Sequence, residues 1–398
     1  MDFTFNKEDM AFQQEVRDFM KKELPEDWPG IPWVGEPAKE TKDSLAFARN
    51  FTEKMRVKGW LTMHWPKEYG GEDAPLSKRV IFAREIGYWK APQLDIYGPS
   101  IVGETLINFG TEEQKKEHLP LILNGNVLWT QGFSEPDAGS DLASLRTSAV
   151  EKGEYFIVNG QKTWTSAAHH ADWMFLLVRT DPDAQSKHKG ISLLYTDIKT
   201  PGITPRPLLN IAGGHTFNEV FLDNVKIPKN NLIGKKNDGF RYAMATLDYE
   251  RSSSVKMIGS MERRLEDLVG FVNQERAKGS NRTNEHLVNE RLAKLATDIE
   301  VAKLLAYRVV HQDAKGKPVT WEASMLFAFY ADLMKRLCRV GTQILGPYGQ
   351  LGPDSQYALL HGMEQSGYLY TPAYSLAGGT TEIQRNIVAW RGLGLPRA

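Results

Sequence analysis

The spacing of apolar residues changes twice along this 398-residue chain, and those changes constrain the fold more than any other feature. Over the first third, apolar residues recur every three or four positions, which predicts amphipathic helices. The middle segments are short, rich in β-branched and aromatic residues and bounded by turn residues, which predicts strands. Helical spacing then returns. We therefore expect an α+β protein with an N-terminal helical domain (1–128), a central β domain (129–234) and a C-terminal helical bundle (235–398).

Composition narrows the class of partner. The chain has 49 basic and 49 acidic residues, so no charge excess indicates nucleic acid binding, and we expect a small-molecule ligand. Its single cysteine, Cys338, excludes an intrachain disulfide or a cysteine cluster, which favours a reducing, cytoplasmic setting. We expect no signal peptide and no membrane span, because long uncharged apolar runs are absent. Rossmann and P-loop glycine motifs are also absent.

Two segments of the β region could hold a cofactor. In GFSEPDAGSD, Ser134 precedes a turn of small residues whose backbone N–H groups could approach an anion or a flat ring, although a plain surface turn has the same composition. In QKTWTS, Trp164 and Ser166 alternate along an expected strand and would share a face, as a cofactor wall or as core packing.

Two local predictions concern neighbouring residues. The VNGQ segment at residues 158–161 is typical of a hairpin turn. His169 and His170 are adjacent, so we expect them on opposite sides of a strand, and no third ligand stands at a metal-like spacing. We therefore predict no metal site.

The segment DGFRYAMATLDYERS places a carboxylate on an apolar helical stripe. Glu250 follows Leu247 by three positions and Ala243 by seven, with Arg251 beside it. Apolar surroundings raise the pKa of a carboxyl group, which suits a general base. An ion-paired structural glutamate is the alternative.

A fourth segment, SLAGGTTEIQRNIVA, predicts a helix start near the C-terminus. Gly378 and Gly379 precede two threonines, and Thr381 with Gln384 fits a capping box. The N–H groups at such a start could hold a phosphate or a thioester carbonyl.

Taken in order, these segments resemble the acyl-CoA dehydrogenase family over essentially the whole chain. The matching motifs are WPKEYGG, GTEEQK, FSEPDAGSD, NGQKTWTS, LDYERS, QILGPYG and GGTTEIQRNIVA. The resemblance implies a helical N-terminal domain, a central β-barrel-like domain and a C-terminal four-helix bundle, assembled as a tetramer with one FAD per active site. It also implies acyl-CoA as substrate and an electron-transfer flavoprotein as acceptor.

The resemblance further assigns roles to individual residues. Those expected at the flavin or at phosphates are Phe133, Ser134, Gly139, Ser140, Trp164 and Ser166. Those expected to reach the FAD of a neighbouring subunit or its adenosine half are Gln343, Gly346, Thr380 and Glu382. Those expected to face the acyl-CoA are Ser140, Arg251, Gly378 and Gly379.

The sequence departs from the family pattern at the base. Many members carry a glutamate where this chain has Gly378, whereas a group resembling the isovaleryl-CoA and long-chain enzymes carries it on the helix before an arginine. Glu250 occupies that second position. The resemblance thus implies that Glu250 takes the α-proton while the β-hydride passes to flavin N5, giving a trans-2-enoyl-CoA. The N–H of Gly378 is expected to stabilise the thioester oxygen as charge develops.

A second departure is the missing Arg-x-x-Phe-Gly segment, for which Arg276 or Arg282 could substitute. These features resemble bacterial dehydrogenases of bulky acyl-CoAs, some of which pair two different chains as α2β2, so both a homotetramer and a heterotetramer stay open. A flavin-dependent oxidase, monooxygenase or desulfinase on the same fold, or a non-catalytic partner subunit, are the alternative functions. The acyl group, whether bulky, branched, cyclic or dicarboxylic, is not decided.

Overall fold

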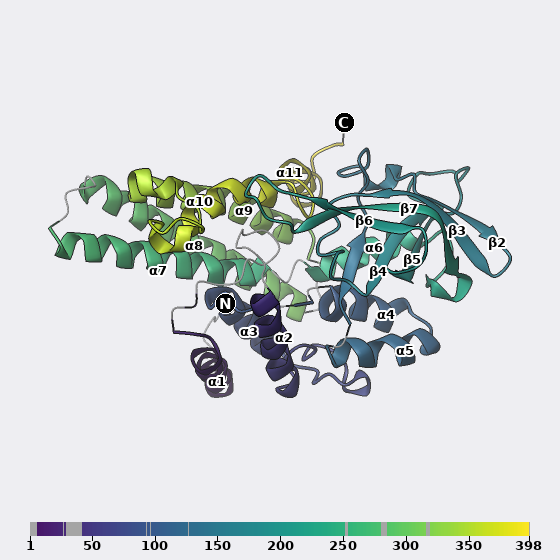
Figure 1. Ribbon diagram of the computed structural model, residues 1–398, viewed down its shortest axis with the longest axis horizontal. Coiled ribbons are helices and arrows are strands. Elements are labelled where there is room, and N and C mark those ends of the chain that lie inside the picture. The colour runs from purple at the N-terminus through teal and green to yellow at the C-terminus, as the bar shows by residue number, and fades with distance from the viewer. Residues whose placement is uncertain are drawn as a thin grey trace. The chain divides into compact units, whose positions relative to one another are not determined.

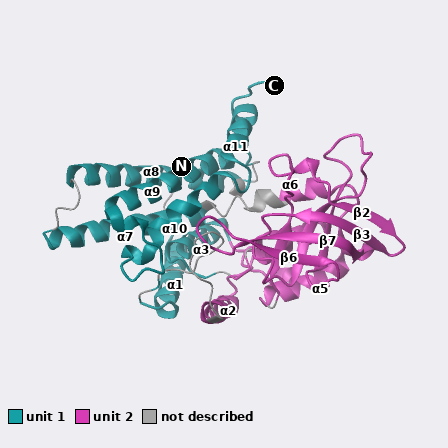
Figure 2. Cartoon of the chain, turned by 45° about the horizontal axis from the view of Figure 1, so that its top comes forward, with its two compact units in different colours: residues 1–40, 75–92, 251–398 teal, residues 41–74, 93–250 magenta. Residues whose placement is uncertain are grey.

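A computed structural model describes residues 6–26, 28, 42–92, 94–95, 97–125, 127–250, 254–279, 285–315 and 319–397. For residues 42, 246–250, 254 and 313–314 it describes the backbone alone. The chain forms two compact units, coloured separately in Figure 2. The sheet unit comprises Thr41–Ala74 and Gln93–Glu250, and the bundle unit comprises Met1–Glu40, Pro75–Pro92 and Arg251–Ala398.

The sheet unit is built on one mixed sheet. Its strands are β1 (Trp129–Gly132), β2 (Ser148–Lys152), β3 (Tyr155–Lys162), β4 (Trp173–Arg179), β5 (Ile191–Asp197), β6 (Ile203–Leu208), β7 (Phe217–Pro228) and β8 (Leu232–Ile233). They lie in the order β6-β7-β3-β2-β4-β5-β8, with β1 paired in parallel to β4. Long β7 pairs with both β6 and β3, as Figure 1 shows.

Strand β4 explains why this part of the sequence reads as continuously apolar. Phe175 and Leu177 pack into a core shared with helical residues, whereas Met174, Leu176 and Val178 pack into a second core made of strand and loop residues. Both faces of β4 are therefore buried, and period-two alternation disappears. The first core receives the helices α4 (Gly103–Phe109), α5 (Glu112–Leu123) and α6 (Gly239–Glu250), and α2 (Lys42–Val57) completes the unit.

The bundle unit combines helices from both ends of the sequence. They are α1 (Lys7–Glu23), α3 (Leu76–Tyr88), α7 (Ser254–Ala277), α8 (Glu285–Ala314), α9 (Trp321–Leu345), α10 (Met363–Tyr370) and α11 (Thr381–Ile387). Their shared core runs from Val80 on α3 through α7, α8 and α9.

The crossing of α3 and α7 is unusually close. A Cβ at Gly87 would lie 1.9 Å from the carbonyl oxygen of Lys256, and one at Gly259 would lie 2.1 Å from that of Arg84. Only glycine at both positions lets the two backbones approach this far.

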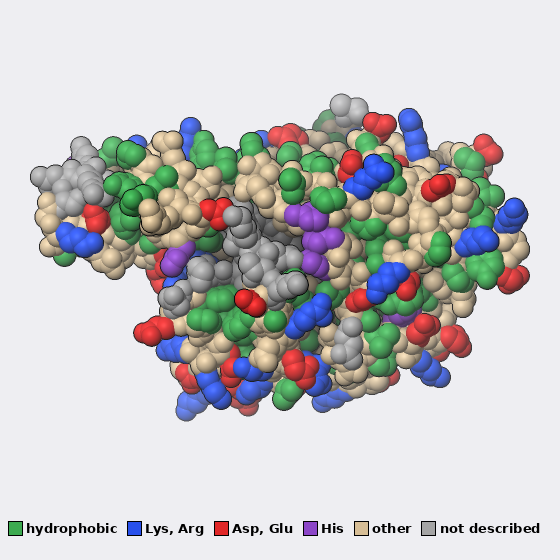
Figure 3. Space-filling view, in the orientation of Figure 1, with side chains coloured by type: hydrophobic (Ala, Val, Ile, Leu, Met, Phe, Trp, Pro, Cys, Tyr) green, Lys and Arg blue, Asp and Glu red, His purple; other side chains and the backbone are tan. Residues whose placement is uncertain are grey.

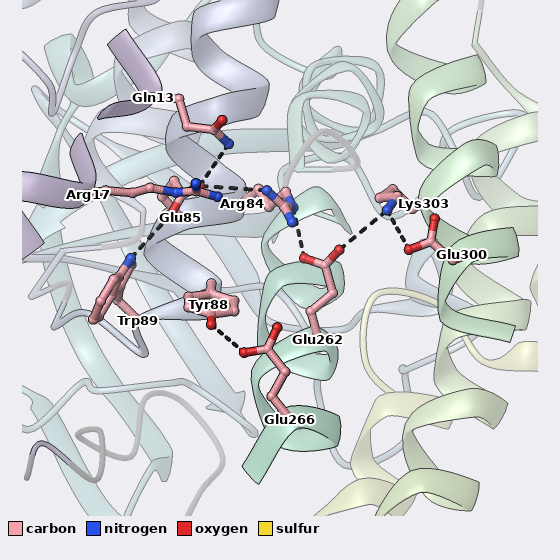
Figure 4. A network of polar contacts seen from close by, with 10 residues as sticks. All are labelled: Gln13, Arg17, Arg84, Glu85, Tyr88, Trp89, Glu262, Glu266, Glu300 and Lys303. Carbon is pink, nitrogen blue, oxygen red and sulfur yellow. Dashed lines mark hydrogen bonds and ion pairs between the residues drawn. The ribbon is translucent and has the colours of Figure 1, made fainter. Parts of the chain in front are cut away.

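Polar contacts reinforce this crossing (Figure 4). The Glu85 carboxylate is 1% exposed and accepts hydrogen bonds from Gln13, Arg17 and Trp89 at 2.9, 2.9 and 3.2 Å. Arg84 donates to Glu262 on α7 at 2.8 Å, and Glu262 also pairs with Lys303 on α8. This network joins α1 and α3 to the bundle, although they lie far from it in the sequence.

The predicted α+β class is confirmed. The domain boundaries at 128 and 234 stay predictions, although β1 begins at Trp129 and β8 ends at Ile233. No helix in the described part of the chain is long and apolar enough to span a membrane.

The predicted hairpin turn at residues 158–161 is wrong. These residues lie inside β3, where the pairing with β7 shifts register between Val158 and Gly160. The Asn159 side chain accepts the Asn224 N–H at 2.8 Å, and a Cβ at Gly160 would lie 2.5 Å from the Thr147 hydroxyl. Asn-Gly therefore serves a β-bulge here, which uses the same residue types as a turn.

Candidate functional site

The loop after β1 carries the first predicted cofactor residues. Glu135 and Ala138 exchange backbone hydrogen bonds of 3.1 Å, which confirms the tight turn expected there. The Phe133 ring is buried against Phe175, with ring centroids 5.0 Å apart, so its main chain rather than its ring is left to face a ligand. At Gly139, no atom of the described residues lies within 4 Å of a Cβ position.

Trp164 and Ser166 follow β3 rather than lie in it, so the expected strand alternation is wrong. Trp164 has φ 57°, a left-handed conformation that a tryptophan adopts rarely. Its indole is 58% exposed and stands edge-on to Phe217 at 5.6 Å, whereas Ser166 is buried. Backbone hydrogen bonds between Thr165 and Asn218, at 3.0 and 3.1 Å, maintain this conformation. Strain held in this way is characteristic of functional sites.

The two segments lie side by side. The Thr163 N–H donates to the Ser134 carbonyl at 2.9 Å. The Thr130 hydroxyl donates to the Ser166 carbonyl at 2.7 Å. The structure thus brings together two of the motifs that sequence reasoning selected separately.

The prediction that His169 and His170 lie on opposite sides of a strand is also wrong. They lie in a turn, with ring centroids 4.0 Å apart, and His215 stacks on His169 at 3.9 Å. Burial and the two neighbouring imidazoles lower the pKa of His169 to about 4. Histidine side chains gather visibly on one face of the molecule (Figure 3). Among the described residues, no group of three or more His, Cys, Asp or Glu could hold a metal ion.

Gln131 is a candidate that sequence reasoning missed. It lies on β1, two residues from Trp129 and two from Phe133, both of which are buried in the same core. Its Nε2 is buried without a hydrogen-bond partner in the described structure. Such a donor costs about 1–3 kcal/mol unless a ligand or water accepts from it. Nothing in its sequence context distinguishes Gln131 from an ordinary strand residue.

Helix α6 carries the proposed base. Its backbone is helical through Glu250, as predicted, while the side chain of Glu250 and the whole of Arg251 lie outside the described residues. The start of α6 is anchored on β5, because a Cβ at Gly239 would lie 2.4 Å from the Leu193 nitrogen. The Tyr242 hydroxyl accepts the Lys235 N–H at 2.9 Å and fixes the approach to the helix.

The C-terminal loop of the bundle unit begins α11 one residue earlier than predicted. Thr380, not Thr381, is the N-cap, and its hydroxyl accepts the Ile383 N–H at 3.2 Å. Gln384 donates to the carbonyls of Gly378 and Gly379, at 3.0 and 3.2 Å, instead of completing a capping box. Both glycines have left-handed φ values, 64° and 92°, so the paired glycines set the turn.

A side chain at Gly378 would meet an aromatic ring. Its Cβ would lie 3.2 Å from Cε2 of Phe327 on α9. Glu382, the next acidic residue, has its pKa lowered by the backbone N–H and hydroxyl groups at the helix start.

The remaining predicted contacts lie elsewhere in the bundle unit. Arg276 donates to Asn289 at 2.7 Å, and Gln343 accepts from Arg291 at 2.7 Å, so both engage their own chain. Gly346 ends α9 with φ 59°. Gln343 is separated from Phe327, beside Gly378, by sixteen residues of helix or about 24 Å. The structure therefore does not gather Gln343 and Gly378 into one place. Arg282 lies outside the described residues.

The sheet-unit segments fit a flat aromatic ligand that accepts hydrogen bonds. They offer an exposed indole at Trp164, open space at Gly139 and the unpaired amide of Gln131. An isoalloxazine ring has these properties, since it combines a planar face with pyrimidine carbonyls.

Comparison with known proteins gives matches along the whole chain. Three family models match in order, namely acyl-CoA dehydrogenase, N-terminal domain, at residues 6–126, middle domain at 130–225 and C-terminal domain at 237–393. Acyl-CoA dehydrogenase IpdE1 of Mycobacterium tuberculosis is 35% identical, over 97% of this chain and 97% of its own.

Two solved structures of related proteins are also similar. The Tcur3481-Tcur3483 steroid ACAD matches with a TM-score of 0.88 and 29% identity, over 100% of both chains. The ChsE4-ChsE5 complex from Mycobacterium tuberculosis matches with a TM-score of 0.86 and 30% identity, also over 100% of both chains.

Proposed function

This chain belongs to the acyl-CoA dehydrogenase family, and from that premise we propose that it uses FAD to introduce an α,β-double bond into an acyl-CoA thioester. Members of the family are flavoprotein oxidoreductases of acyl-CoA degradation, and this chain is an enzyme of that kind. The choice of FAD, the residues that act and the acyl group are the parts that we propose.

The observation that carries the proposal is the strained, exposed Trp164 beside the Ser134 loop. Bound FAD would supply the acceptor for a hydride from the β-carbon. Trp164 would lie against the ring, and the main chain of Phe133 and Ser134 would hold it from the neighbouring loop. The unpaired Nε2 of Gln131 could donate to an acceptor oxygen of the bound group.

Glu250 is the proposed base. It ends α6, and in the sequence it shares a helical stripe with Ala243 and Leu247; an apolar stripe raises the pKa of a carboxyl group, which suits a base. By the family resemblance, many members carry the catalytic glutamate at the position of Gly378. Glycine has no side chain that could act as a base there. Its backbone N–H is the proposed donor to the thioester oxygen, which lowers the cost of the developing negative charge.

The proposed acyl group is bulky and polycyclic. Similarity to a steroid ACAD over the whole chain supports this class. Glycine at position 378 also leaves out the side chain that a glutamate would add there, next to the Phe327 ring. Glutaryl-CoA and short straight-chain thioesters serve as the contrasting substrates in the test.

The proposed assembly is an α2β2 heterotetramer with a second, related chain, and the proposed electron acceptor is an electron-transfer flavoprotein. The similarity to a ChsE4-ChsE5 complex, which contains two different chains, supports the first part. The family resemblance supports the second. Size measurement after co-expression with candidate partner chains checks the assembly.

The test of the base is flavin bleaching under anaerobic conditions. Glu250→Gln keeps its yellow FAD but reduces the bleaching rate by about 100- to 10,000-fold, which is the usual contribution of a general base. Asp248→Asn is the matched control, because residues two apart on a helix do not share a face. Bleaching of the Glu250→Gln enzyme at the normal rate would refute the assignment. A panel of steroid, glutaryl and butyryl thioesters identifies the acyl class.

A further inference from the structure

Lys162 has an unusual place for a lysine. It is the last residue of β3, and its side chain is 0% exposed. Among the lysines that the structure describes, it alone is fully buried. Its ammonium donates to the Glu135 carboxylate at 2.8 Å and to the Phe133 carbonyl at 3.2 Å.

Glu135 completes the arrangement. Its two carboxylate oxygens accept the N–H groups of Arg146 and Thr147 at 2.7 and 2.9 Å. Burial would raise the pKa of Glu135, but the Lys162 ammonium and these donors lower it below its ordinary value. Burial lowers the pKa of Lys162 to about 8 against the attraction of Glu135, so both groups are ionised at neutral pH.

A buried ion pair usually adds little to the free energy of unfolding. Desolvation of the two charges offsets most of their attraction, and well-packed neutral side chains of similar size often serve equally well. The geometry of the contacts indicates what Lys162 achieves instead. It holds a main-chain carbonyl and a carboxylate that stand two residues apart in the loop after β1.

We propose that Lys162 is a positioning residue for the flavin, which fixes the Phe133–Ser134 segment against the Trp164–Ser166 segment. This inference rests on the proposed function. Lys162 stands directly before Thr163, whose N–H binds the Ser134 carbonyl at 2.9 Å, and two residues before the left-handed Trp164. The three contacts from residues 162 and 163 therefore set the separation of the two walls.

A lysine is needed here because its long side chain reaches both acceptors and its ammonium group has enough donors for both. An ammonium carries three protons on a long stem and can serve both acceptors at once. A neutral apolar side chain leaves the Phe133 carbonyl and Glu135 without this link, while the strands on either side keep their pairing. The loop then moves relative to Trp164, and the flavin loses contacts without loss of the fold.

The test separates positioning from folding with the double variant Lys162→Met/Glu135→Gln. The glutamine carbonyl oxygen can accept from one of the two backbone N–H groups, those of Arg146 and Thr147, and no unpaired charge is left buried. We expect a cooperatively folded apoprotein with a modest fall in Tm, from the backbone groups left without partners, but FAD affinity about 10- to 100-fold lower, the weight of one charge-assisted hydrogen bond. A changed shape of the flavin absorption band accompanies it. The measurement is fluorescence titration of FAD into apoprotein, with any chain that co-purifies.

The matched control is Arg17→Met/Glu85→Gln, which neutralises an ion pair on a similarly buried glutamate of the bundle unit. We expect it to leave FAD affinity unchanged. Wild-type FAD affinity and an unchanged flavin band in the Lys162 double variant would overturn the inference. So would an equal loss of affinity in the control. If the double variant does not fold, Lys162→Gln is measured against the same criteria. A wild-type enzyme that binds no FAD contradicts the proposed function itself, and the inference falls with it.

Discussion

Replacement of Gly378 by alanine tests whether this loop can carry a side chain. A non-glycine residue in the left-handed region costs about 1–2 kcal/mol, and Gly378 has φ 64°. The new Cβ would also stand 3.2 Å from Cε2 and 3.4 Å from Cζ of Phe327, which is tighter than ordinary contact. We expect a total loss of about 2 kcal/mol in the free energy of unfolding, or roughly 4–8 °C in Tm for a unit of this size.

The assay is thermal unfolding of the apoprotein, because bound flavin would mask the effect by mass action. Gly279→Ala is the control for the backbone term, since Gly279 has φ 73° and no described atom lies within 4 Å of a Cβ there. The difference between the two variants measures the Phe327 contact, and Gly378→Ala combined with Phe327→Leu should remove it. Gly378→Ala with wild-type stability would show that the loop relaxes freely. The same constraint predicts that Gly378→Glu does not restore flavin bleaching to Glu250→Gln.

Three further predictions concern stability. His169 has its pKa lowered from about 6.5 to about 4, so its stabilising contribution is complete above pH 6.5 and is lost as the pH falls towards 4. Denaturant titrations at pH 7.5 and 4.5 should show a smaller pH dependence for His169→Gln. Glu85→Ala removes the acceptor of the α1–α3 network and should cost about 3 kcal/mol, with non-additive coupling to Arg17→Met in a double-mutant cycle. Gly270→Ala, inside α7 with nothing within 4 Å of its Cβ, should stabilise by about 0.5–1 kcal/mol in urea unfolding, and no gain would indicate a hidden contact.

Much of the fold follows from the sequence because the cores are large. Strands β4 and β5 are buried on both faces, and their uninterrupted apolar runs distinguish them from the helices around them. The loop at residues 64–75 contains two prolines and a glycine pair, which interrupt α-helices, and a 3-10 turn forms at Lys67–Tyr69. These features are local and need no knowledge of distant partners.

Predictions failed where the same residue types occur in two different kinds of local structure. Asn159–Gly160 has the composition of a turn, but its side-chain contact with Asn224 on β7 uses it for a bulge. Trp164 has strand propensity, yet the backbone pairing of Thr165 with Asn218 holds it in a left-handed conformation. Both outcomes depend on residues more than fifty positions away, which local propensity does not contain.

The sequence predicted the motifs that form the candidate site, but it did not predict the contacts between them. The FSEPDAGSD and NGQKTWTS segments were selected separately, whereas their adjacency depends on hydrogen bonds from Thr130 and Thr163. The sequence did not mark Gln131 or Lys162 as candidate site residues, because an amide or an ammonium in a strand ordinarily faces solvent. Only their burial makes them informative.

The position of the base has a consequence for how the active site is built. Glu250 ends α6, which begins on β5 about 17 Å away and belongs to the sheet unit, as do Phe133, Ser134, Trp164 and Ser166. Gly378 belongs to the bundle unit. With a glutamate at 378, the base would stand on one unit and the flavin walls on the other. With Glu250 as the proposed base, the proton acceptor and the proposed flavin-binding residues belong to the same unit. Proton removal should therefore be more sensitive to a change at the α6 anchor, such as Tyr242→Phe, which removes the acceptor of the Lys235 N–H, than to Glu85→Ala in the bundle unit. Equal effects of the two substitutions on the bleaching rate would contradict this division.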